Sequence, residues 1–173
     1  DDLTSTNDGF AFATGVTLTS TDALTIQTGE GAGDDLVITG TLTETNNPDL
    51  TIDAGAAGDI TLTGAVDLGT GSLTIRDAAI VEVSSTLAAS AFTQTDGTTS
   101  TTIDNTATIT NAFAFTGQAL TLSGANNTVG TTMTVTNAGV FTTGDAANLT
   151  VGNEFVQNGA GNSVIGDDLT STN

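Results

Sequence analysis

Short alternations of apolar and polar residues run along the whole chain and leave little room for any element except β-strands. Examples are "VTLTS" (16–20), "DITLTG" (59–64) and "TATIT" (106–110). A period of two places successive side chains on opposite faces of a strand, and Thr, Val and Ile favour strands. Turn signals rich in Gly, Asn and Asp separate these segments, as in "DAGAAGD" and "SGANN". We therefore predict an all-β chain, in which residues 85–92 are the one stretch that would also suit a short helix.

The strands recur within a repeated phrase: an apolar-x-apolar segment, a Gly turn and an apolar-Thr-apolar segment. Clear copies are "FAFATGVTL" (10–18), "AVDLGTGSLTI" (65–75), "FAFTGQALTL" (113–122) and "VFTTGDAANLTV" (140–151). A β-repeat of about 20–30 residues is typical of a solenoid, in which each coil stacks its short strands on those of the next. We predict a β-solenoid with about 6–7 coils per 166 residues. A tandem β-sandwich is the alternative, because it also has regular short strands.

In such a solenoid the aliphatic residue of each alternation points into the lumen and the flanking Thr points outward. The residues that we expect to be structural, as inward core positions, are Leu18, Ile26, Ile38, Ile52, Leu62, Ile75, Ile103, Leu120, Val135 and Val151.

The seven-residue segment DDLTSTN, called the heptad below, occupies residues 1–7 and again residues 167–173. We interpret this segment as the seam of a tandem array, in which residues 1–166 are one solenoid unit and residues 167–173 begin the next identical copy. The alternative explanations of the repeated segment are a coincidence of biased composition and an artefact. The expected partner is then the chain itself, with copies joined end to end and fibres packed side by side.

The charge balance excludes several classes of function. One basic residue, Arg76, stands against twenty acidic ones, which gives a formal net charge of −19. Such a surface repels nucleic acid and anionic membranes, and no apolar run is long enough to span a membrane. Without Cys, His or Lys, a conventional nucleophile–base pair and Schiff-base chemistry are missing, so we do not expect an enzyme. The acidic surface favours a secreted, extracellular location, where cations screen self-repulsion.

No cofactor is required on this interpretation, but calcium or another divalent cation is a weak candidate. "EGAGDDLVI" (30–38) contains part of a calcium-binding nonapeptide, with Gly31, Gly33 and Asp35 at matching positions and Asp34 beside them. The match does not recur in tandem, as such sites require. A Gly-rich acidic turn is the simpler interpretation of residues 30–38. The other alternative to a defined calcium site is diffuse binding of divalent cations to the pairs Asp1/Asp2, Asp34/Asp35 and Asp167/Asp168.

Outward Thr columns on a solenoid also suit ice binding. The Thr-x-Thr elements begin at residues 17, 41, 61, 106 and 134. Because this spacing is uneven, we do not expect the regular array that an ice surface requires.

Phrases such as "ALTLSGANNTVGTTMTVTNAG" and "LTIDAGAAGDITLTG" resemble the repeats of very large bacterial surface proteins. These are the filamentous-haemagglutinin-like exoproteins and autotransporter passengers. The resemblance covers the whole chain and lies in the general repeat pattern rather than in any specific motif. It implies a right-handed parallel β-helix, secretion to the cell surface, and a role as a filament shaft, stalk or adhesin. We therefore expect a structural repeat of an extracellular fibre. The alternatives are the shaft of an adhesin with a separate binding tip and, further away, an ice- or calcium-binding module.

Overall fold

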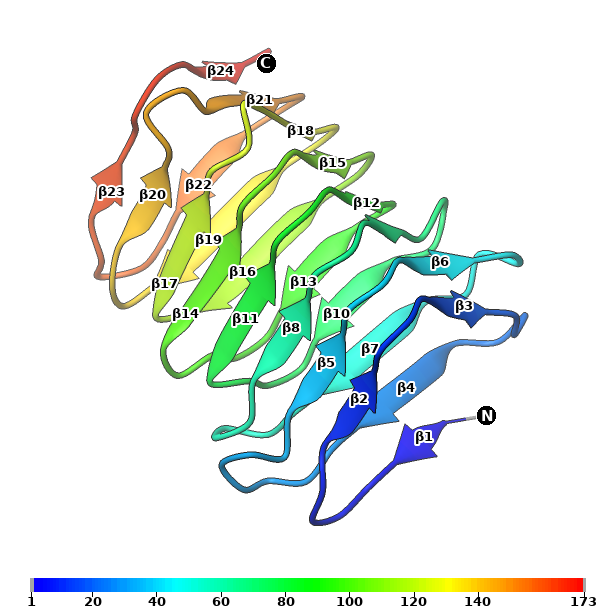
Figure 1. Ribbon diagram of the computed structural model, residues 1–173. Helices are drawn as coiled ribbons and strands as arrows, with labels where there is room; N and C mark the ends of the chain where they lie inside the picture. Colours follow the sequence, from blue (N-terminus) through cyan, green and yellow to red (C-terminus); the bar gives the residue numbers. More distant parts are fainter. Residues whose placement is uncertain (1, 173) are drawn as a thin grey trace.

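The computed structural model describes residues 2–172 as a right-handed parallel β-helix, and no helix occurs among them. The chain winds through three parallel sheets in turn, with eight strands in each sheet. Figure 1 shows the coils stacked into a rod, with the N-terminus at one end and the C-terminus at the other. The fold class predicted from the alternation is thus confirmed.

Each sheet takes every third strand of the chain. Sheet A contains β1 (Leu3–Thr4), β4 (Leu24–Gln27), β7 (Leu50–Asp53), β10 (Leu73–Ile75), β13 (Phe92–Gln94), β16 (Phe113–Gly117), β19 (Met133–Asn137) and β22 (Phe155–Gln157). Sheet B contains β2 (Phe10–Phe12), β5 (Leu36–Ile38), β8 (Ile60–Leu62), β11 (Ile80–Val83), β14 (Ser100–Ile103), β17 (Ala119–Leu122), β20 (Phe141–Thr143) and β23 (Ser163–Val164). Sheet C contains β3 (Val16–Leu18), β6 (Leu42–Glu44), β9 (Val66–Asp67), β12 (Leu87–Ala89), β15 (Ala107–Ile109), β18 (Asn126–Val129), β21 (Asn148–Val151) and β24 (Leu169–Ser171).

The coils differ in length, yet their strands remain in register. The longest coils take 26 residues, as from Leu24 to its partner Leu50, and the shortest take 19, as from Leu73 to Phe92. The extra residues of the longer coils lie in turns outside the sheets. Because most coils are shorter than the phrase spacing suggested, residues 2–166 contain 23 strands in three sheets, or between seven and eight coils, rather than the six or seven expected.

A continuous apolar lumen forms the core of the rod. All ten residues that we predicted as inward core positions are at most 7% exposed. In the middle of sheet A, Phe92 and Phe113 pair in register, and their rings stack with centroids 4.6 Å apart. Burial of apolar side chains on both sides of every coil boundary is the main stabilising contribution to such a stack.

Residues 85–92 form no helix. They contribute β12 and the first residue of β13, and Leu87 is fully buried. The β-sandwich alternative is wrong as well, because every strand pair in the described residues is parallel, whereas sandwich domains of the immunoglobulin type pair their strands in antiparallel fashion. Inter-coil hydrogen bonds outweigh the local preference of the Ala-rich stretch for helix.

The lumen also contains polar side chains, which the alternation did not predict. Gln94 is 2% exposed, and its side-chain oxygen accepts a 2.7 Å hydrogen bond from Thr101 Oγ1. Two coils further on, Asn137 Oδ1 accepts a hydrogen bond from Gln157 Nε2. These polar groups satisfy one another, so their burial costs little.

Candidate functional site

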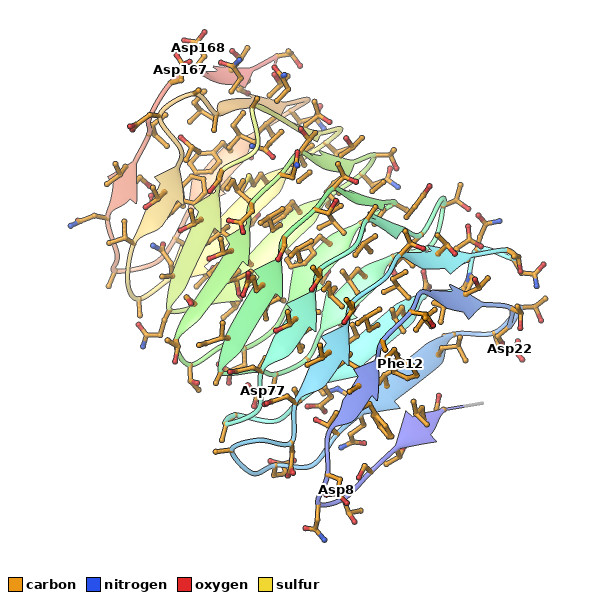
Figure 2. The ribbon with its side chains drawn as sticks, in the orientation of Figure 1. Asp8, Phe12, Asp22, Asp77, Asp167 and Asp168 are labelled. Atoms are coloured by element: carbon orange, nitrogen blue, oxygen red, sulfur yellow. The ribbon has the colours of Figure 1, made fainter. Side chains whose placement is uncertain are left out.

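The N-terminal end of the rod is an open apolar surface. A hollow of about 190 Å³ is lined there by Leu3, Phe12, Val16 and Leu24, among others. Leu3 is 38% exposed, and Phe12, Val16 and Leu24 are only partly buried. Figure 2 shows Phe12, the last residue of β2, near the N-terminal end of the rod. Side chains at this end are therefore partly exposed, whereas the residues at the corresponding positions of inner coils are buried.

The C-terminal end of the rod is open in the same way. Ile165 and Leu169 are each 37% exposed, although Leu169 pairs with the fully buried Leu149 of the preceding coil. Phe155, in the last strand of sheet A, is partly buried against the core. Both ends thus combine apolar side chains with outermost strands, β1 to β3 at one end and β22 to β24 at the other, that pair on one side only among residues 2–172, an arrangement that templates further strand pairing.

Aspartates that precede strands connect one coil to the next. The Oδ1 atom of Asp49 accepts hydrogen bonds from the backbone N–H of Ser72 at 2.8 Å and from its hydroxyl at 2.7 Å. These bonds to Ser72 lower the pKa of Asp49. Asp59 accepts in the same way from the N–H of Ile80, and Asp2 from the N–H of Thr25. The recurrent Asp-Leu and Asp-Ile pairs of the sequence therefore fasten coils together.

The residues proposed from sequence for calcium form a tight turn. Asp34 Oδ2 accepts a 2.9 Å hydrogen bond from the N–H of Gly31, and Gly33 has a φ of +94°, a conformation that glycine adopts readily. Asp35 Oδ1 accepts from the N–H of Asp59 in the next coil. Both carboxylates thus serve as acceptors for backbone groups. Within residues 2–172, no group of three or more acidic side chains is arranged to hold a metal ion, and calcium binding stays a prediction. Asp1, named with Asp2, lies outside the described residues.

An acidic corner near Arg76 has no counterpart in the sequence predictions. The guanidinium of Arg76 lies 3.2 Å from Asp53 Oδ2. Nearby, burial raises the pKa of Asp77, and the negative charges of Asp96, Asp53 and Glu30 raise it further. One carboxylate oxygen of Asp77 is buried without a hydrogen-bond partner among the described residues. Spacing could not reveal this corner, because its residues come from different coils.

The outward Thr residues form straighter columns than their sequence spacing suggested. In sheet C, Thr108 pairs with Thr128, Thr128 with Thr150, and Thr150 with Thr170. The uneven spacing is absorbed by turns, so our reason for discounting a regular array was wrong. The column is nevertheless only one residue wide, because Gly130 and Gly152 occupy the positions two residues after Thr128 and Thr150.

The two copies of the heptad lie in different sheets. Leu3 of β1 pairs with Ile26 in sheet A, whereas Leu169 of β24 pairs with Leu149 in sheet C. Figure 2 shows Asp167 and Asp168 beside β24, at the end of the rod opposite Asp8. The outermost residues of the predicted unit and seam, Asp1 and Asn173, are not among the described residues.

Comparisons with protein-family models, with curated proteins and with solved structures find no match. Among the described residues, no helix is long and apolar enough to cross a membrane.

Proposed function

We propose that the chain is a structural repeat of a long extracellular fibre or stalk, in which copies continue one another as a single β-solenoid. The observation that carries this proposal is the openness of both ends of the rod. Leu3 at one end and Ile165 and Leu169 at the other are more than a third exposed, although equivalent inward residues of the inner coils are buried. A further coil at each end would cover them and pair the free strand edges.

The repeated heptad supports continuation within one polypeptide rather than association of separate chains. Asp8 and Asp22 lie at the N-terminal end, and Asp167 and Asp168 at the C-terminal end (Figure 2). Separate copies would bring these like charges together in the absence of any basic residue except Arg76. Covalent linkage makes the junction intramolecular, so the effective concentration of the two ends outweighs the repulsion.

The function is mechanical on this proposal. Parallel ladders and the apolar lumen give stiffness, while the acidic, Thr-rich exterior keeps fibres apart in water or lets divalent cations bridge them. The same exterior disfavours binding to nucleic acid, because phosphate contacts need Lys and Arg. No catalytic role, cofactor or membrane span is part of the proposal. The extracellular and bacterial setting rests on the net charge of −19 and on the resemblance to repeats of bacterial surface proteins.

The test compares chains that contain one, two and three copies of the 166-residue unit. If the solenoid continues, small-angle scattering gives a rod that lengthens by about 37 Å per copy, at about 4.8 Å per coil. The melting temperature also rises with copy number, because each junction adds an interface. The control is a two-copy chain in which a flexible Gly/Ser segment replaces the junction heptad. Equal melting temperatures for one, two and three copies, with dimensions of beads on a string, would overturn the proposal.

A further inference from the structure

The different positions of the two heptads determine how copies would join. β1 and β24 carry the same sequence, and β24 comes 23 positions after β1 in the order of the strands. Three sheets take the strands in strict rotation. Since 23 is not a multiple of three, an identical copy that starts at β24 cannot return its strands to the sheets that they occupy in the first copy.

We propose that each copy in the array enters the solenoid one sheet out of phase with the copy before it, a rotation of about one third of a turn. This rests on the proposed function, because it concerns the junction of a continuous fibre. Strands of sheet A in one copy then continue sheet C of the preceding copy, strands of sheet B continue sheet A, and strands of sheet C continue sheet B.

Coil length supports the shifted junction. Continuing residue 166 into residue 1 of the next copy makes the coil from Phe155 to Phe10 of that copy 21 residues long, and the coil from Ser163 to Val16 19 residues long. Both values fall within the range of 19 to 26 residues found inside the rod. Returning the heptad to sheet A would leave only 14 residues between Phe155 and Leu169. Fourteen residues are fewer than the shortest coil uses.

The exposed side chains of the two ends match in this register. β22 would stack on β2 of the next copy, which places Phe155 against Phe10 and continues the aromatic contact that Phe141 makes with Phe155 at 5.5 Å. β23 would stack on β3, so that Leu18 of the next copy covers Ile165.

The heptad itself keeps its native partner in this junction. β24, as the β1 of the next copy, would stack on the following β4. Asp168 would then accept a hydrogen bond from the N–H of Thr25 in that copy, as Asp2 does within the first copy at 2.9 Å. Only two ladders at the seam are new, namely β22 with β2 and β23 with β3.

The shift gives the fibre a longer period than its sequence. Each copy would rise by about 37 Å, and equivalent faces would align again only after three copies, at about 110 Å for 23 coils of about 4.8 Å.

Engineered cysteines can measure the phase, because the chain has no Cys of its own. In a two-copy chain, the shifted junction places Val156 of the first copy opposite Ala11 of the second, at the spacing of about 4.8 Å between adjacent strands, which a disulfide can bridge. In a junction that kept each sheet in line, Ala11 of the second copy would lie opposite Val164 instead.

The two test variants are therefore Val156→Cys and Val164→Cys, each combined with Ala11→Cys in the second copy. Thr134→Cys with Val156→Cys is the positive control, because these residues pair in register within one copy.

The expected result is rapid disulfide formation, under mild oxidation, in the Val156 variant and in the control, and at least a tenfold slower reaction in the Val164 variant. Preferential cross-linking of the Val164 variant, in a chain that still lengthens by about 37 Å per copy, would overturn the phase shift and leave the fibre proposal standing. Cross-linking of neither test variant while the control reacts, with no such lengthening, would overturn both proposals.

Discussion

The stacked rings of Phe92 and Phe113 offer the sharpest test of the solenoid core. Phe113 is 1% exposed and lies in register between Phe92 on one coil and Met133 on the next. Replacing Phe113 with Ala removes a ring that its neighbours cannot fill, because both belong to strands held by ladders on each side. Fully buried Phe→Ala changes cost about 3–5 kcal/mol. We expect a loss in that range for Phe113→Ala in the free energy of unfolding.

The contact between the two rings can be separated from burial by a double-mutant cycle. Phe92→Ala, Phe113→Ala and the double variant are unfolded in urea and followed by far-UV circular dichroism. With centroids 4.6 Å apart and planes inclined by 22°, the pair is expected to be coupled by about 0.5–1.5 kcal/mol beyond the loss of buried area. Thr93→Ala, on the outward face of the same strand, is the matched control and should change stability by less than about 0.5 kcal/mol. Additive losses for the two Phe variants, or a loss below about 1 kcal/mol for Phe113→Ala, would refute this account of the core.

Three further perturbations test the contacts between coils. Gly64→Ala should lower stability by about 1–3 kcal/mol, measured by urea unfolding, because a Cβ atom there would lie 2.3 Å from the carbonyl oxygen of Gly40 in the preceding coil. Asp77→Asn should raise the melting temperature at pH 7, because burial and nearby carboxylates raise the pKa of Asp77 above 3.8. The neutral form of Asp77 therefore favours folding below pH 3.8, and this contribution to stability is lost as pH rises through the folded-state pKa. The gain should therefore shrink on acidification, and an equal gain at pH 3 and pH 7 would contradict it. Asp49→Asn should have the opposite pH profile, because the bonds from Ser72 lower the pKa of Asp49 below 3.8 and stabilise the fold above that pH. Its destabilisation, a fraction of a kcal/mol for so exposed a group, should vanish as pH falls through the folded-state pKa of Asp49.

The sequence predicted the core because alternation reports on each strand separately. Leu62 and Ile75 are flanked by outward Thr, and a period of two assigns them to the lumen without knowledge of their neighbours. The number of coils depends instead on how many residues the turns use. That quantity is not periodic, which is why between seven and eight coils are found in the unit where six or seven were expected.

The polar contacts were harder to predict because they arise between strands that meet only in the folded chain. Asp77 comes close to Asp53 and Asp96 only once the coils have stacked. The hydrogen bond between the buried Gln94 and Thr101 joins β13 to the next strand, β14, where the chain passes from one sheet to another. In the sequence these are ordinary polar residues of a Thr- and Asp-rich chain, and no spacing marks them as partners.

A phase-shifted junction also limits what the outer faces of the fibre can do. The Thr column of sheet C ends in Thr170, which corresponds to Thr4 of the next copy, and Thr4 pairs with Gln27. The row that follows therefore begins with Gln27 and its partner Asp53, not with another Thr. In the proposed array this column, one residue wide, would be interrupted at every seam and would not by itself match the two-dimensional spacing of an ice surface over the length of a fibre. The rotation instead distributes each face of the unit around the rod, so lateral contacts recur on three sides at intervals of about 37 Å. This pattern favours cross-bridged bundles over binding by a single flat face.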